Sequence, residues 1–250
     1  MKGKHFMNDM YKFPNYHVDY MLLSYKKFAT ASTSKSEHEP CFALDGNKKT
    51  FWSSKSGKAG EWFMVDLGAV KTVHAVRFDC TTKDAVFSLS GSTDGKEYEL
   101  LFSGKNEAVP LDGTINFENQ KRLRFLKLVF LSNDDNNCFT VNDFKVLGFG
   151  NGYAPEKVEQ PFAIRTSDNE AVICWNRVST AVGYKVRLGT SPEELDECRL
   201  VYGEDSVSID SLTDGQTEYY YAVDSFNENG VTKGDIRQMG AAKSELYRIQ

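Results

Sequence analysis

Apolar and polar residues alternate in short runs along the chain, and this period of two predicts strands rather than helices. The clearest runs are 61–67 and 123–130 in the first half and 184–189 and 219–224 in the second. Weaker runs predict further strands at 29–33, 70–78, 87–92, 98–102, 114–117, 139–147, 162–165, 171–175, 200–202 and 207–209. The pattern as a whole indicates an all-β protein.

The alternation stops at 150–157, where glycine and proline cluster as they do in linkers. With 250 residues, the chain is long enough for two domains. We therefore expect a first β domain at 25–149 and a second at 158–250, which ends in a C-terminal tail. Residues 1–24 are irregular, and only 17–25 could form a strand there.

Composition narrows the class of partner. The 17 Phe and 12 Tyr residues favour strands. A net charge of −5 argues against nucleic acid, which attracts basic surfaces, and against a polybasic membrane anchor. No apolar run reaches the roughly 18 residues that span a bilayer, so we expect no membrane span.

The reactive side chains do not predict catalysis. Five cysteines, an odd number without a CxxC pair, indicate free thiols rather than a zinc site or a full disulfide framework. The four histidines lack metal-ligand or triad spacing, and the GxSxG, HExxH and P-loop motifs are missing. Acidic residues such as Asp94 and Asp214 fall in turns, as solvated surface residues do. We expect no enzyme activity in this chain.

Two neighbouring segments are the most distinctive. Residues 43–53 read ALDGNKKTFWS, and residues 61–68 read EWFMVDLG. Together they resemble the opening of a discoidin domain (coagulation factor V/VIII type C, galactose-binding-like), a family that includes family 32 carbohydrate-binding modules. Residues 141–148 resemble the closing strand of the same family. The resemblance implies a jelly-roll β-sandwich that binds oligosaccharides or polysaccharides.

The first segment could hold a hard cation. Asp45, Asn47 and Thr50 supply three oxygen-bearing side chains on one turn, and Gly46 allows the backbone to fold around an ion. Calcium prefers such oxygen ligands. The alternative is an Asx turn without metal, in which Asp45 caps backbone amides.

The resemblance implies the rest of a structural calcium site. Asp143 stands where the family usually has Glu on its last strand and would add a carboxylate. The backbone carbonyls of Phe42, Thr50 and Asn142 would complete the shell. Such an ion would tie the two ends of the domain together.

Discoidin modules bind their ligands with loops at one end. The candidate loops are 34–40, 53–60, 81–85 and 132–139. Sugar sites combine an aromatic plate with charged and amide groups, and the groups available here are Glu37, His38, Lys55, Lys83, Asn133, Asn136, Asn137 and Phe139.

The chain also departs from the galactose-binding members. These tend to have His at the position of Ser53 and Arg near Cys80 and Thr81. Solvated loops without a ligand therefore stay an open alternative. Trp52 and Trp62 lie beside strands, and we expect both in the core rather than in a sugar site.

Residues 212–230 resemble the corner and F strand of a fibronectin type III domain, and the resemblance covers about 155–240. It implies that Tyr219 is the corner tyrosine, with its hydroxyl bound to backbone upstream. It also implies that Trp175 fills the core from strand B.

Residues 20–27, YMLLSYKK, resemble the junction before the accessory domain of bacterial family 43 glycoside hydrolases (xylosidase or arabinofuranosidase type). This implies an accessory region whose partner is an upstream catalytic domain. It also implies a periplasmic, cell-surface or extracellular location, although no export signal stands in the sequence. The alternatives are a structural spacer without a sugar site and a cell-surface adhesion module.

Overall fold

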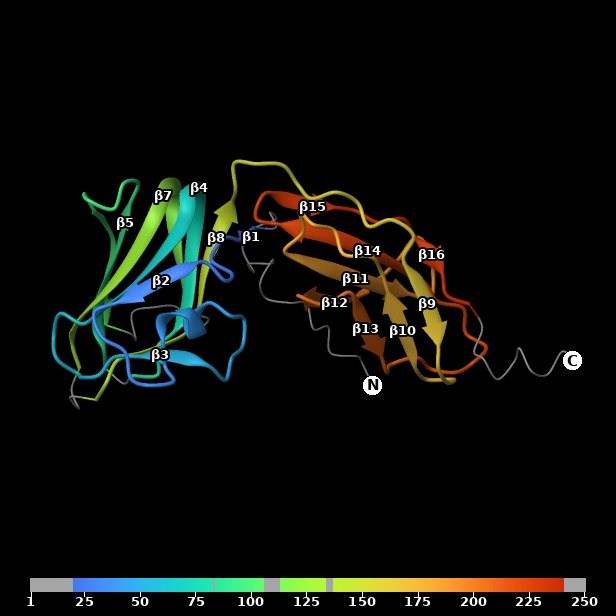
Figure 1. Cartoon of the computed structure of the whole chain (residues 1–250), viewed down its shortest axis with the longest axis horizontal. Coiled ribbons are helices and arrows are strands. Elements are labelled where there is room, and N and C mark those ends of the chain that lie inside the picture. Colours follow the sequence, from blue (N-terminus) through green and yellow to red (C-terminus); the bar gives the residue numbers. More distant parts are fainter. Residues whose placement is uncertain (1–19, 83, 106–112, 134–136, 241–250) are drawn as a thin grey trace, which may run out of the picture. The chain divides into compact units, whose positions relative to one another are not determined.

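The computed structural model describes residues 20–82, 84–105, 113–133 and 137–240. Within this part, every regular element is a strand except one 3-10 turn, η1 (Pro40–Ala43), so the prediction of an all-β fold is confirmed. The chain forms two compact units, Tyr20–Asn151 and, within the described residues, 152–240 (Figure 1).

The first unit is one continuous network of antiparallel strands. Its central strands follow the order β1-β8-β4-β7-β5-β6, while β2 pairs with β4 and β3 pairs with β8 (Figure 1). The strands are β1 (Met21–Leu22), β2 (Phe28–Ala31), β3 (Phe51–Ser53), β4 (Trp62–Asp79), β5 (Val86–Ser92), β6 (Glu99–Lys105), β7 (Thr114–Ser132) and β8 (Thr140–Phe149).

Strands β4 and β7 are long enough to serve two layers. The register between them shifts from Asp66 to Lys71, next to Gly68 with its φ of +81°. Before the shift β4 pairs with β2, and after it β4 pairs with β8. The rings of Phe63 and Phe144, one from each layer, lie 5.3 Å apart, so the layers enclose a shared aromatic core.

The two long strands correct the sequence analysis. The runs 61–67 and 70–78 are one strand, and so are 114–117 and 123–130. The Asp66 carboxylate accepts a hydrogen bond from the Gly68 backbone amide, at 2.8 Å, which holds the bend without ending the strand.

The first unit begins earlier than expected. Tyr20 and Leu23 are buried, and β1 pairs with β8 through Met21 and Gly148. The Ser24 hydroxyl donates to the Phe144 carbonyl, at 3.0 Å. Residues 20–24 thus belong to the β unit and not to an irregular segment; the rest of the expected strand at 17–25, residues 17–19, lies outside the described residues.

The second unit contains two smaller sheets. Strands follow the order β13-β10-β9 in one and β12-β11-β14-β15 in the other, where β16 also pairs with β14 (Figure 1). They are β9 (Phe162–Arg165), β10 (Ala171–Cys174), β11 (Gly183–Gly189), β12 (Glu197–Tyr202), β13 (Ser206–Ile209), β14 (Tyr220–Asn227), β15 (Gly230–Thr232) and β16 (Arg237–Gln238).

Two predicted contacts of this unit are confirmed. Trp175 is buried in the hydrophobic core that the two sheets share. The Tyr219 hydroxyl accepts a hydrogen bond from the Thr213 backbone amide, at 2.8 Å, six residues upstream. All five cysteines carry free thiols.

Candidate functional site

The loops expected to bind ligand are gathered at one end of the first unit. The loop 34–40 is joined to the loop 53–60 by backbone hydrogen bonds. The Lys35 amide donates to the Ser53 carbonyl, at 2.9 Å, and the Ser53 amide donates to the His38 carbonyl, at 3.2 Å. These two loops therefore form one surface, although they are separate in the sequence.

The loops before β8 and after β4 join the same end. The Ser54 amide donates to the Phe139 carbonyl, at 2.9 Å. The Thr82 hydroxyl donates to the Cys138 carbonyl, at 3.2 Å. All four candidate loops are thus connected through hydrogen bonds, in agreement with the grouping predicted from the sequence.

A buried carboxylate holds this end rigid. Glu61 accepts hydrogen bonds from the hydroxyls of Ser32, Thr33 (2.8 Å) and Ser56 (2.7 Å). Burial alone would raise the pKa of Glu61, but the hydroxyl donors, led by Ser32, outweigh it and leave the pKa below its ordinary value. The Glu61 side chain thus ties two loops together in its charged form.

Sequence reasoning missed Glu61. In the sequence it is only the first position of an alternating strand. The available signal was the cluster of hydroxyl residues at 32–34 and 53–56, which are short donors suited to a carboxylate acceptor.

Three of the predicted sugar-binding residues lie on this surface. Glu37 and Lys55 are exposed. His38 is partly exposed, and its imidazole stacks on the Phe51 ring with the centroids 4.1 Å apart. Lys83 and Asn136 lie outside the described residues. The Asn133 side chain donates to the Asn137 carbonyl, at 2.8 Å, across the loop before β8.

Phe139 requires a correction. Its side chain is fully buried and stacks on Phe130, with ring centroids 4.4 Å apart. A ring enclosed in the core presents no face to a ligand, so Phe139 is a packing residue rather than a sugar plate.

The two tryptophans differ in burial, so the prediction that both lie in the core is right for Trp52 and wrong for Trp62. Trp52 is fully buried, as expected, and its indole N–H donates to the Thr33 carbonyl, at 3.0 Å. Trp62 is partly exposed on the outer face of its sheet. His74 is a packing residue, stacked on Tyr20 at 4.4 Å, and burial lowers its pKa.

The predicted calcium loop gathers part of its oxygen atoms, whereas the Asn47 side-chain oxygen accepts from the Lys49 backbone amide, at 3.1 Å. The Thr50 hydroxyl lies 3.0 Å and 2.8 Å from the two carboxylate oxygens of Asp45 and 2.8 Å from the Asn47 carbonyl. The Asn47 amide donates to Asp45 Oδ1, at 2.8 Å, which is the Asx turn considered as the alternative. Gly46 adopts a φ of +77°, a conformation that glycine allows without strain.

The closing strand brings its predicted ligands beside this loop. Phe51 pairs with Asn142 in the antiparallel register of β3 and β8, which places Thr50 opposite Asp143. The Asn142 side-chain oxygen is buried and has no hydrogen-bond partner.

The Asp143 carboxylate is already neutralised. It accepts from the Lys145 ammonium at 2.6 Å, and both side chains are nearly buried. A cation here would therefore meet one carboxylate without an ion-pair partner among the described residues, Asp45, rather than the two that the resemblance implied. An ion at this place would give the Asn142 oxygen a partner, although other buried side-chain atoms, such as Trp175 Nε1, also have none among the described residues.

Comparisons with known proteins find similarity in the first unit. Residues 28–143 match the family model described as the F5/8 type C domain. The match covers less than half of the 250 residues, and residues 152–250 lie outside it.

One curated relative is similar over a short segment. The polysaccharide lyase 8 family protein HylA of Enterococcus faecalis is 33% identical over 64 residues, which make up 26% of this chain. The chain spans 5% of the length of that relative.

Solved structures of carbohydrate-binding modules are similar to about half of the chain. Chitosan-binding module 1 from the chitosanase/glucanase of Paenibacillus sp. IK-5 is 23% identical, with a TM-score of 0.45 over 51% of this chain and 98% of the module. The CBM32-1 module of a family 31 glycoside hydrolase from Clostridium perfringens is 22% identical, with a TM-score of 0.41 over 50% and 96%. A pectin-binding module is 25% identical, with a TM-score of 0.42 over 48% and 88%.

Across the described ranges, the structure contains no helix with the length and apolar character needed to cross a membrane.

Proposed function

We propose that the first unit is a non-catalytic carbohydrate-binding module that binds glycans through the four loops at its end. One observation carries the proposal. In a segment that matches the F5/8 type C domain, Glu37, His38 and Lys55 stand on loops that hydrogen bonds join into one surface.

The chemistry of these three side chains suits a sugar. Phe51 backs the His38 ring, so a flat and fixed surface is offered to a pyranose. Lys55 donates and Glu37 accepts hydrogen bonds, which matches the alternating hydroxyls of a glycan. Because the Glu61 network fixes the loop backbone, little entropy is lost when a ligand binds.

The test is a glycan array with the full chain, followed by calorimetry on the best ligand. His38→Ala and Lys55→Ala should each weaken binding by about 10-fold or more, as expected for loss of a polar contact in the site. Lys96→Ala is the matched control, since Lys96 is exposed in the β5–β6 turn at the opposite end of β5.

If both loop variants bind glycan with wild-type affinity, the proposal that these loops form the binding site is wrong. Failure of the wild-type chain to bind any glycan would favour the structural spacer or the adhesion module instead.

We also propose that calcium holds this unit together through Asp45, Asn47, Thr50 and Asn142, with the Phe42 carbonyl and Asp143 as further oxygen donors. The ion would supply positive charge that stabilises the clustered oxygens, and it would take no part in a reaction. At a calcium concentration 100 times the Kd, binding would stabilise the unit by about 2.7 kcal/mol.

The calcium proposal is tested by thermal unfolding with calcium and with chelator. Wild type should melt at a higher temperature with calcium. Asp45→Asn keeps an oxygen to cap the Asn47 amide but loses the charge, so its melting temperature should be the same in both buffers. If the wild-type melting temperature is the same with and without calcium, the loop is an Asx turn without a metal ion.

For the second unit we propose a fibronectin type III domain that serves as a spacer. The hydroxyl contact of Tyr219, the buried Trp175 and the two antiparallel sheets support it. A structure-guided chimaera tests this. Replacement of 158–240 by an unrelated spacer should leave glycan affinity unchanged, and a loss of affinity would assign the unit a binding role.

We further propose that the chain serves a larger secreted glycan-degrading enzyme, such as a glycoside hydrolase of the family 43 type. The similarity to a segment of a polysaccharide lyase 8 family protein supports an enzyme of this broad kind. Sequencing the genomic region around the coding sequence tests it. A catalytic domain in the same reading frame is expected, and a reading frame without one would overturn the proposal.

A further inference from the structure

The outer face of the sheet in the first unit has an unusual composition. Along β4 the buried residues Phe63 and Val65 alternate with Trp62, Met64 and Asp66, which point outward and are partly exposed. An outward position on such a strand is ordinarily polar. Here a tryptophan and a methionine occupy two of the three positions.

A lysine lies between two aromatic rings on this face. Lys127 pairs with Met64 on β4 and with Ser90 on β5. Its ammonium is 4.7 Å from the centroid of the Trp62 ring and 5.9 Å from that of Tyr98. These distances are within the range of cation–π attraction, so the rings hold the charge over the sheet.

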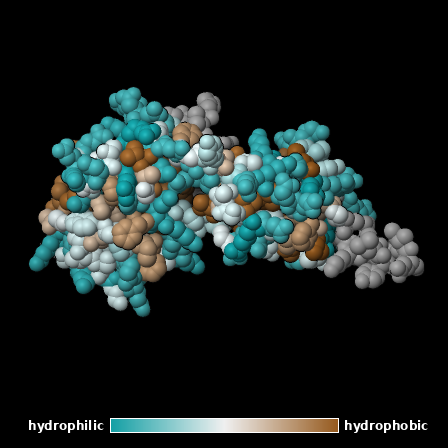
Figure 2. Space-filling view, turned by 45° about the horizontal axis from the view of Figure 1, so that its top comes forward, coloured by the Kyte–Doolittle hydropathy of each residue, from teal (hydrophilic) through white to brown (hydrophobic). Residues whose placement is uncertain are grey.

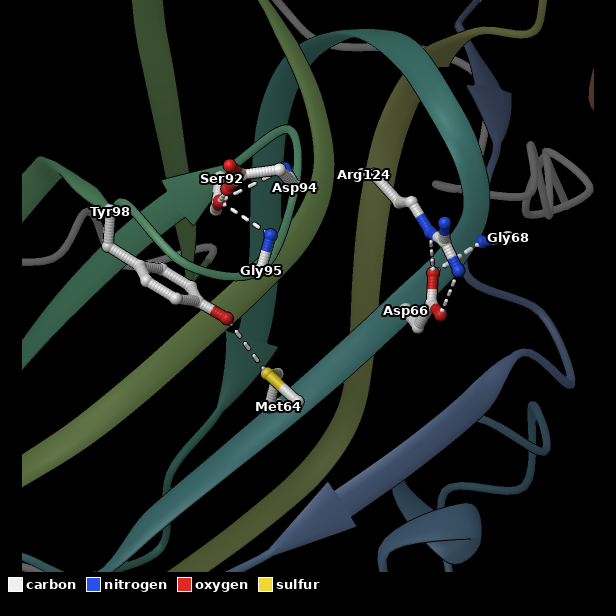
Figure 3. A network of polar contacts seen from close by, with 8 residues as sticks. All are labelled: Met64, Asp66, Gly68, Ser92, Asp94, Gly95, Tyr98 and Arg124. Carbon is white, nitrogen blue, oxygen red and sulfur yellow. Dashed lines mark hydrogen bonds and ion pairs between the residues drawn. The ribbon is translucent and has the colours of Figure 1, made fainter.

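Tyr98 reaches this face from the β5–β6 turn. Its hydroxyl donates to the Met64 sulfur, at 3.2 Å, and Figure 3 shows the ring extending across the strands toward Met64. Burial, with smaller contributions from the charges of Asp94 and Asp66, raises the pKa of Tyr98 above its ordinary value. The contact fixes the ring as a neutral flat surface.

The two carboxylates whose charges act on Tyr98 are already engaged (Figure 3). Arg124 binds both oxygens of Asp66, at 2.8 Å each. Asp94 accepts from the backbone amides of Lys96 and Glu97 and from the Ser92 hydroxyl. No carboxylate pairs with Lys127 among the described residues, so the face offers a free cation.

The face also carries Val129 of β7, which pairs with Trp62, and two short hydroxyls. Ser88 and Ser90 lie on β5 beside Val129 and Lys127 of β7. Figure 2 shows one side of the molecule, where apolar residues form small separate patches among hydrophilic ones. The mixture of rings, hydroxyls and a cation differs from the wholly apolar surface that packs against another protein domain.

We propose that this outer face, formed by Trp62, Met64, Tyr98 and Lys127, is a second binding site, for acidic polysaccharides. Trp62 and Tyr98 lie against the apolar faces of sugar rings, Lys127 pairs with a uronate carboxylate, and Ser88 and Ser90 bind ring hydroxyls. The four-carbon stem of Lys127 lets the ammonium move aside from Trp62 when the sugar enters. Because the face starts at Trp62, next to the loop 53–60, one chain can continue from the loop end onto the sheet.

Polygalacturonate is the probe, and its fully methyl-esterified form is the neutral counterpart. In affinity electrophoresis with the full chain, Lys127→Gln should weaken polygalacturonate binding by about 10-fold, the size expected for loss of one charge-assisted contact. Binding to the ester should be weak and unchanged by Lys127→Gln. Trp62→Leu, which keeps an apolar side chain, should weaken both.

Lys26→Gln is the matched control, because its ammonium also lies over an aromatic ring, that of Tyr25, at 5.3 Å from the centroid. It should bind as wild type does. Circular dichroism and melting temperatures show whether each variant is folded.

Two results would overturn the proposal: equal affinity of wild type and Lys127→Gln for polygalacturonate, or equal loss in Lys26→Gln. A wild-type chain that binds no acidic polysaccharide would also overturn it. The loop variants His38→Ala and Lys55→Ala separate the two sites, since loss of the loop site alone leaves the effect of Lys127→Gln in place.

Discussion

At the scale of single residues, Glu61 is the most consequential side chain that the sequence did not single out. Three hydroxyl donors hold its carboxylate in a buried position between two loops. Its pKa is lowered in the folded protein although burial opposes this, so folding favours the ionised form.

The stability that Glu61 supplies should therefore depend on pH. A lowered pKa contributes stability above the ordinary value of 4.5, and this stability is lost as the pH falls through the folded pKa. At pH 7, Glu61→Gln should lower the free energy of unfolding of the first unit by about 1–2 kcal/mol, because a neutral acceptor binds hydroxyls more weakly.

Urea unfolding at pH 7 and at pH 3 measures this difference. The gap between wild type and Glu61→Gln should narrow at pH 3. Glu97→Gln, an exposed position, serves as the control and should stay close to wild type at both values. A gap of equal size at both values would show that the charge of Glu61 contributes no stability.

At the scale of elements, the start of β8 is held by packing. Phe139 is fully buried against Phe130, so Phe139→Ala should cost the first unit about 3–5 kcal/mol. Phe28→Ala, at a position that is 70% exposed on β2, should change the unfolding free energy by less than about 0.5 kcal/mol.

Thermal unfolding of both variants measures this difference in stability. A third variant, Phe139→Leu, distinguishes a packing role of the ring from a sugar-binding role. If Phe139 only packs, the leucine variant keeps glycan affinity. If the leucine variant folds but no longer binds glycan, Phe139 belongs to the sugar site.

Elements such as β5 and β9 could be predicted because their alternation is local. The joining of two runs into β7 could not, because residues 118–122 are all polar and resemble a loop. Backbone pairing with β4 continues through part of that stretch, to Lys121 and Arg122, and the side chains do not reveal it. A strand is defined by its partner as well as by its own sequence.

The same reasoning explains the candidate site. Asp45, Asn47 and Thr50 are five residues apart at most, and their grouping was visible in the sequence. The burial of Phe139 depends on Phe130 and on Ser54, which is 85 residues away. Likewise, the outward direction of Trp62 follows from the register of β4 in its sheet, which no local pattern fixes.

At the scale of the whole molecule, each unit has its own hydrophobic core. Trp175 belongs to the core of the second unit, whereas Trp52 and Phe63 belong to that of the first. Separate cores are the usual basis of separate cooperative unfolding.

Calorimetry of the full chain should therefore resolve two transitions. Trp175→Ala should lower the melting temperature of the second unit only, because it costs that unit about 3–5 kcal/mol of unfolding free energy. Phe139→Ala should lower the melting temperature of the first unit only. A shift of both transitions in either variant would mean that the two units unfold as one.

The pairing of Met21 with Gly148 has a practical consequence for the first unit. The first and last strands of the unit, β1 and β8, are hydrogen-bonded neighbours, so the two ends of its chain lie close together. A unit of this geometry can be spliced into an exposed hairpin of an unrelated host without stretching that host, and several copies can follow one another along a single polypeptide.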